Sequence, residues 1–142
     1  KSKLPICTGI GRGVCVGMTK AAAIYNFWAG FGIPAYEENS VPSGKDAPEF
    51  PYITYQLITD SFGADVAMTA SLWYRDSSWV NANAKADEIS EAIGYGGDVI
   101  FCDGGSIWLK RGRPFAQRMG DASDTMIKRI IINVEAEYFS RD

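Results

Sequence analysis

The segment 126–139, MIKRIIINVEAEYF, alternates apolar with polar side chains and predicts a long β-strand. One of its faces carries only apolar or aromatic side chains: Ile130, Ile132, Val134, Ala136 and Tyr138. The rest of the segment is dominated by charged and amide side chains: Lys128, Arg129, Asn133, Glu135 and Glu137. This pattern indicates an antiparallel sheet with one face on the core and the other face left open.

Further strands are predicted upstream of this segment. YITYQLIT (52–59) and VAMTASLWY (66–74) also alternate, and the short turn between them favours an antiparallel pair. DVIFCDGGSIWLKRG (98–112) predicts a hairpin with short strands at 99–102 and 106–110. The open face of the sheet is then expected to show Trp73, Thr69, Ser71, Gln56, Glu135 and Glu137.

Two helices are predicted. The first lies in TKAAAIYNFWAGFG (19–32), where Thr19 is a suitable N-cap. Its apolar side chains share one face: Ile24, Phe27, Trp28 and Phe31. The second lies in DSSWVNANAKADEISEAIG (76–94), where Gly94 is a natural C-cap. Its start offers three capping residues, and its apolar stripe is narrow: Asp76, Ser77 and Ser78, then Ala82, Ala86, Ile89 and Ile93.

The order of these elements indicates the fold class. Segments 33–51 and 113–125 are expected to be loops, because the first holds four prolines and the second is polar. The sequence therefore predicts an α+β fold, a mainly antiparallel four- to five-stranded sheet with two helices packed on one face. Residues 18–142 are expected to form a single domain after a glycine-rich, basic N-terminal extension at 1–17.

The charge is unevenly distributed along the chain. The net charge is −3, and residues 1–17 contribute +3 with no acidic residue, which leaves −6 for the rest. A body this acidic is a poor non-specific binder of nucleic acid. No apolar run approaches the roughly 20 residues that a membrane-spanning helix needs. We therefore expect no membrane association.

The 142 residues include no histidine, which excludes nucleophilic catalysis of the Ser-His and Cys-His types. The three cysteines Cys7, Cys15 and Cys102 have no metal-ligand spacing, and their odd number argues against a disulfide framework. We expect reduced, partly buried thiols. Carboxylate or lysine chemistry stays open, so a small carboxylate-dependent enzyme is one alternative.

The stretch GIGRGVCVGMTKAAA (9–23) raises the alternative of a nucleotide-binding protein. A phosphate-binding Walker loop needs two glycines separated by four residues, followed directly by lysine and serine or threonine. Here only three residues separate Gly13 from Gly17, and Met-Thr-Lys follows. No strand pattern precedes the stretch. We therefore interpret it as a leader, and we hypothesise that the usual protein begins at Met18 and that residues 1–17 are an upstream extension.

The other charged clusters have plain structural interpretations. Three acidic groups fit a solvated face or a cap, and the last of them resembles a helix start or a turn: Glu37-Glu38, Asp87-Glu88, and Asp121 with Asp124. The basic run at 110–113, with Arg118 nearby, is the best candidate contact patch, but it lacks the aromatic interleaving of RNA-binding modules. Aromatic residues make up 13% of the chain, which favours an assembly protein. No catalytic residue, cofactor site or metal site is predicted.

Three stretches carry a resemblance to a known family: MTKAAAIYNFWAGFGIPAYEENSVP (18–42), FPYITYQLITD (50–60) and IKRIIINVEAEY (127–138). Over residues 18 to about 139 the chain resembles the tail terminator (tail-completion) proteins of long-tailed bacteriophages. Head-closure or other neck proteins of similar size are the nearest alternative within the virion.

This resemblance implies a structural protein without catalysis. Its members form a ring, usually a hexamer, that caps the head-proximal end of the tail tube, stops tube polymerisation and joins the tail to the head connector. The implied partners are further copies of the chain, the tail tube protein and the neck protein. DNA would only pass through the lumen. The implied location is the virion tail, assembled in the host cytoplasm.

The family provides no catalytic residues to transfer, so the expected interface comes from the loops at 36–50 and 111–124. The candidate contact residues are Tyr36, Glu37, Glu38, Lys45, Trp73, Arg111, Arg113, Arg118 and Asp121. We expect reversal of Arg111 and Arg113 to glutamate to impair ring or neck assembly without unfolding the subunit.

Overall fold

The computed structural model describes residues 18–140, so the predictions for the leader and its glycine stretch lie outside the described residues. The fold is α+β, with two α-helices and one curled six-stranded sheet. The helices are α1 (Lys20–Ala29) and α2 (Val80–Ile93), and two 3-10 turns are η1 (Glu38–Ser40) and η2 (Gly44–Asp46). The strands are β1 (Ala35–Glu37), β2 (Tyr52–Tyr55), β3 (Asp65–Arg75), β4 (Asp98–Cys102), β5 (Gly105–Gly120) and β6 (Ile127–Ser140).

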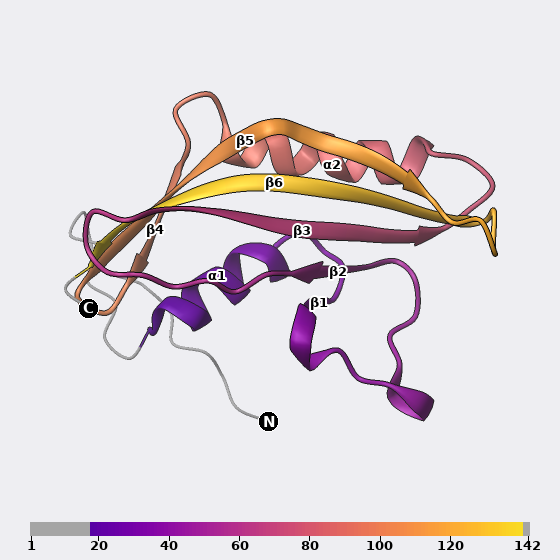
Figure 1. The fold of residues 1–142 in the computed structure, drawn as a ribbon, viewed down its shortest axis with the longest axis horizontal. Helices are drawn as coiled ribbons and strands as arrows, with labels where there is room; N and C mark the ends of the chain where they lie inside the picture. Colours follow the sequence, from indigo (N-terminus) through magenta and orange to yellow (C-terminus); the bar gives the residue numbers. More distant parts are fainter. Residues whose placement is uncertain (1–17, 141–142) are drawn as a thin grey trace.

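The sheet order is β1-β2-β3-β6-β5-β4, and every pairing is antiparallel except the parallel pair β1–β2. The α+β class and the mainly antiparallel sheet are thus confirmed, while the predicted number of four to five strands was too low. Figure 1 shows β3, β6 and β5 running side by side along the long axis of the molecule.

β6 is the central strand of the sheet. It pairs with β3 from Asp65↔Glu137 to Arg75↔Ile127 and with β5 on its other side. The five predicted core side chains of β6 are all at most 2% exposed: Ile130, Ile132, Val134, Ala136 and Tyr138. The alternation therefore places one face of β6 in the core, as the sequence predicts.

α1 has the predicted cap and the predicted buried face. The Thr19 hydroxyl accepts a hydrogen bond from the Ala22 N–H at 3.0 Å. Ile24 and Trp28 are 1% and 2% exposed, and the Trp28 ring stacks on Tyr55 of β2 with centroids 6.4 Å apart. The aromatic stripe of α1 thus packs on the same sheet face as the β6 core residues.

α2 packs against β3, β5 and β6 through its predicted stripe, since Ala82, Ala86, Ile89 and Ile93 are all buried. Gly94 is its C-cap, with φ of +75°. The predicted N-terminal capping was wrong in detail, because the N-cap is Trp79 and its side chain makes no capping bond. Ser78 contributes instead through its hydroxyl, which accepts from the Val80 N–H at 3.0 Å.

The loop predicted at 33–51 contains a strand. β1 pairs in parallel with β2, with Ala35 opposite Ile53. Three residues are too few for an alternation to show, so the pattern carried no signal. The strand predicted at 52–59 ends at Tyr55, because the Gln56 side chain accepts from the Thr69 N–H at 3.0 Å and the ladder stops there.

The loop predicted at 113–125 was also wrong over most of its length. β5 continues to Gly120, and its register with β6 shifts between Arg111 and Ala116. The irregular segment includes a cis Arg113–Pro114 bond, and residues 116–120 are all exposed. A strand exposed on both faces shows no apolar alternation, and an internal proline argues against a strand. These two features hid the second half of β5.

Gly112 lies in the register shift at a close approach to β6. A Cβ atom added to Gly112 would stand 2.9 Å from the backbone carbonyl carbon of Asn133. We expect Gly112→Ala to lower the free energy of unfolding by about 1–3 kcal/mol, since backbone must move to make room. Gly120→Ala on the same strand is the matched control, because nothing lies within 4 Å of its added Cβ. Urea unfolding compares the two variants, and equal stabilities would contradict the prediction.

The buried side chain of Tyr138 makes the stability of the protein depend on pH in the alkaline range. Its hydroxyl donates to the Ile58 carbonyl oxygen, and burial, with a smaller effect of Asp60, raises its pKa to about 12. The unfolded chain releases this proton near pH 10. The contribution of the protonated Tyr138 hydroxyl to the free energy of unfolding is therefore fully present below about pH 10. It is lost as the pH rises toward 12.

Tyr138→Phe is expected to cost about 1 kcal/mol at pH 7, through the lost hydrogen bond. It should also reduce the fall in stability between about pH 10 and 12, because one of the shifted groups is gone. Urea unfolding at several alkaline pH values measures both. An unchanged pH dependence in the variant would contradict this assignment.

Candidate assembly interface

The sheet face opposite the helices is covered by neither α1 nor α2. At one end, Tyr52, Trp73 and Arg129 occupy neighbouring positions on β2, β3 and β6. The Trp73 ring stacks on Tyr52 with centroids 6.1 Å apart, and its Nε1 donates to the Thr54 hydroxyl at 2.9 Å. The Arg129 guanidinium lies 4.7 Å from the centroid of the Trp73 ring. Tyr36 of β1 contacts the Tyr52 ring from the neighbouring strand. We call the four residues Tyr36, Tyr52, Trp73 and Arg129 the aromatic platform.

The segment that follows β1 is held to this platform at both of its ends. Tyr36 meets Tyr52 edge-on at 6.2 Å, and Phe50 packs on the same ring at 5.4 Å. Burial, and the neighbouring Tyr36, raise the pKa of Tyr52. Between these anchors the chain with the two 3-10 turns extends away from the sheet, at the lower right of Figure 1.

The other end of the open face is acidic. Lys110 pairs there with Glu137 at 3.2 Å and with Asp65 at 3.6 Å, and its ammonium lies 4.6 Å from the Trp108 centroid. Partial burial lowers the pKa of Lys110, but the hydrogen bond and charge of Glu137, and the charge of Asp65, outweigh burial and raise it. Glu135, opposite Lys110, adds a further negative charge.

The predicted composition of the open face is confirmed for four side chains. Trp73, Thr69, Glu135 and Glu137 occupy alternate positions on β3 and β6 that point away from the core. Ser71 also occupies such a position but is buried, and its hydroxyl accepts a hydrogen bond from Arg129 Nε at 3.0 Å.

The predicted contact residues of segment 36–50 fall into two groups. Tyr36 joins Trp73 in the aromatic platform, which brings two of the candidates together. Glu37 makes hydrogen bonds within its own turn, because its carboxylate accepts from the Asn39 amide at 3.1 Å and from the Ser40 hydroxyl at 3.3 Å. Glu38 and Lys45 are exposed in η1 and η2.

The basic candidates do not form one patch. Arg111 lies on the helix side, where it donates to the Ser90 hydroxyl at 2.8 Å and lies 5.7 Å from the Tyr95 centroid. Arg118 lies 5.2 Å from the Trp79 centroid at the start of α2. Arg113 is exposed. Only Arg113 of the expected reversal pair is therefore a pure surface residue, and reversal of Arg111 also perturbs the fold.

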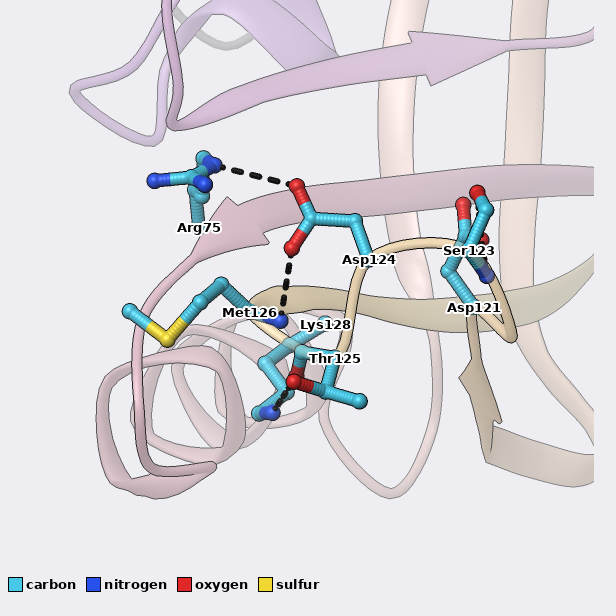
Figure 2. A network of polar contacts seen from close by, with 7 residues as sticks. All are labelled: Arg75, Asp121, Ser123, Asp124, Thr125, Met126 and Lys128. Atoms are coloured by element: carbon cyan, nitrogen blue, oxygen red, sulfur yellow. Dashed lines mark hydrogen bonds and ion pairs between the residues drawn. The ribbon is translucent and has the colours of Figure 1, made fainter.

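Asp121 and Asp124 shape the turn between β5 and β6. The Asp121 carboxylate accepts from the Ser123 hydroxyl at 2.7 Å and from its N–H at 2.8 Å, and these bonds lower the pKa of Asp121. Asp124 accepts from Arg75 Nε at 3.3 Å and from the Met126 N–H at 2.9 Å (Figure 2). Lys128 donates to the Thr125 carbonyl. The turn interpretation of this acidic pair is confirmed.

Sequence reasoning missed Arg129 and Tyr52 as members of the candidate interface. Alternation did place Arg129 among the polar positions of its strand, but it did not place Trp73 beside it. That neighbourhood depends on the register between β3 and β6, and no feature of the separate strands reveals it. Tyr52 was assigned only to a strand for the same reason.

The alternative of carboxylate catalysis finds little support in the described part of the chain. A cleft of about 490 Å³ between α2 and the end of β3 includes Asp76 and Glu88 in its lining. Hydrogen bonds from Ser78 and Asn81 lower the pKa of Asp76, whereas a general acid needs a raised one. Glu88 is paired with Lys85 at 2.9 Å. These two carboxylates therefore have structural partners.

Metal and thiol chemistry would need a group of ligand side chains or a reactive cysteine. Among residues 18–140, no three cysteine or carboxylate side chains are grouped to hold a metal ion. Cys102 is buried, and burial raises the pKa of its thiol, which leaves it protonated and unreactive at neutral pH. No α-helix in that range is long and apolar enough to cross a membrane.

Substitution of Arg111 is expected to destabilise the protein more than substitution of Arg113. Arg111→Ala should lower the free energy of unfolding by about 1 kcal/mol, because its bond to Ser90 ties β5 to α2. Arg113→Ala, at an exposed position, should change it by less than about 0.5 kcal/mol. Thermal unfolding of both variants tests the difference. If both variants are destabilised equally, the hydrogen bond between Arg111 and Ser90 does not stabilise the fold as predicted.

Comparison with known proteins gives a structural likeness. No family model and no curated protein matches the chain. Among solved structures, it is similar to a chain in the virion of a native gene transfer agent (GTA) particle, with a TM-score of 0.55 and 21% identity. The match covers 83% of this chain and 92% of that chain. At this identity the likeness establishes a shared fold, which extends over most of both chains.

Proposed function

We propose that the chain is a structural subunit of a phage-like virion and acts as a tail terminator. The observation that carries the proposal is the fold shared with the GTA virion chain over most of both chains. The resemblance of residues 18–139 to tail terminators points to the same kind of particle. The finer assignment to the head-proximal end of the tail rests on that resemblance.

The proposed activity is assembly by surface complementarity. Copies of the chain form a ring, a hexamer in the family it resembles, whose one side fits the last ring of the tail tube. The other side offers no surface for another tube ring and instead receives the head connector. The open sheet face supplies contact chemistry, because Trp, Tyr and Arg are the residue types that dominate binding energy in interfaces.

DNA is proposed to pass through the lumen of this ring without binding to it. The net charge of −3 for each subunit repels the phosphate backbone. A lumen lined by lysine and arginine in the assembled ring would contradict this part of the proposal.

The test is electron microscopy of particles made without the chain, with the wild-type chain resupplied as the control. Loss of the terminator should give overlong or headless tails, because nothing ends tube growth. Resupply should restore tails of normal length attached to heads. Tails of normal length without the chain would contradict the proposal, and heads that lose DNA beside normal tails would assign the chain to head closure.

A further inference from the structure

Arg129 differs from the other cations of the open face in having no carboxylate partner. Lys110 and Arg75 each have a carboxylate within 4 Å, at 3.2 Å from Glu137 and 3.3 Å from Asp124. Among residues 18–140 none lies that close to Arg129, whose guanidinium lies 4.7 Å from the Trp73 centroid and donates through Nε to the Ser71 hydroxyl at 3.0 Å. That bond uses only Nε, so the terminal nitrogens of a half-buried, pre-oriented guanidinium are available for an external carboxylate.

α2 carries a matching feature on the opposite side of the molecule. Val80, Ala84, Asp87 and Glu91 follow one another at helical spacing along its outer surface, and Tyr95 lies just beyond. Val80 is 71% exposed, Tyr95 is fully exposed, and Asp87 and Glu91 are exposed without a hydrogen-bond or ion-pair partner among residues 18–140. We call these five residues the acidic ridge. It is an exposed helix surface with apolar ends and two unpaired carboxylates.

We propose that the aromatic platform of one copy of the chain binds the acidic ridge of a second copy. The guanidinium of Arg129 pairs there with Asp87 or Glu91 of the neighbour, and the aromatic rings pack against its exposed apolar ends. The dimensions agree. The helical part of the ridge, from Val80 to Glu91, spans about 17 Å at 1.5 Å per residue, and the platform from β1 to β6 spans about 14 Å at strand spacing.

The positions of the two surfaces suit a ring. The platform lies on the open sheet face, whereas α2 packs on the other face, so one copy can engage two neighbours at once. Contacts between two different surfaces are heterologous, and they close into a ring when the rotation between copies allows it. This inference rests on the proposed ring and names the residues that hold its subunits together.

The test is the mass of the purified full-length chain in solution, measured for wild type and charge-reversed variants. The wild type should be larger than the 15.5 kDa monomer. Arg129→Glu and the double variant Asp87→Lys/Glu91→Lys should each weaken association about tenfold or more, because like charges then face one another. The triple variant with all three changes should recover the wild-type mass, since the charge pair is restored in reverse.

The matched control is Asp60→Lys, which reverses one exposed carboxylate outside the proposed contact and outside the segments 36–50 and 111–124. It should keep the wild-type mass. Arg129→Glu also loses contacts to Trp73 and Ser71, so the Asp87/Glu91 variant, altered only on the solvent side of α2, carries the test if Arg129→Glu fails to fold. A monomeric wild type, an Asp87/Glu91 variant of wild-type mass, or a folded triple variant without recovery would each overturn the inference. Tail length in particles is a separate readout, so the ring function can stand if this contact fails.

Discussion

The burial of one face of β6 is the interaction on which the rest of the structure depends. β6 is hydrogen-bonded to β3 on one side and to β5 on the other, and its core side chains, from Ile130 to Tyr138, lie on the face against which α2 packs. Fully burying each large apolar side chain contributes about 1.5–3 kcal/mol. Because successive side chains of a strand point to opposite faces, the same alternation that builds this core also exposes the Arg129–Glu137 side of β6.

The exposed side is therefore a consequence of the core rather than an independent feature. Neither helix covers it, and its two ends differ in chemistry. One end holds Trp73 and Arg129 in a stacked arrangement, and the other holds Lys110 among acidic side chains. Such a surface offers rigid, half-buried contact groups without a catalytic constellation. Trp, Tyr and Arg are the residue types that dominate binding energy in interfaces, so this surface suits the proposed contacts between subunits.

The sequence predicted those parts of the fold in which one face is buried and the other is not. This condition holds for β6, β3 and the β4–β5 hairpin, and for the apolar stripes of α1 and α2. It fails for β1, which is too short to alternate, and for the second half of β5, where residues 116–120 are exposed on both sides. The aromatic platform was only partly foreseen, because the neighbourhood of Trp73 and Arg129 depends on strand register. The separation of Arg111 from Arg113 depends on the register shift in β5, which a linear pattern does not show.

The central claim is that the chain acts as a subunit of a ring at the head–tail junction of a virion. The most direct measurement is an electron cryomicroscopy map of the neck of intact particles that contain the chain. We expect a closed ring of copies of this fold between the head connector and the last tube ring, with subunits meeting through the open sheet face. Purified particles that lack the chain, or a map that places it outside the neck, would contradict the account.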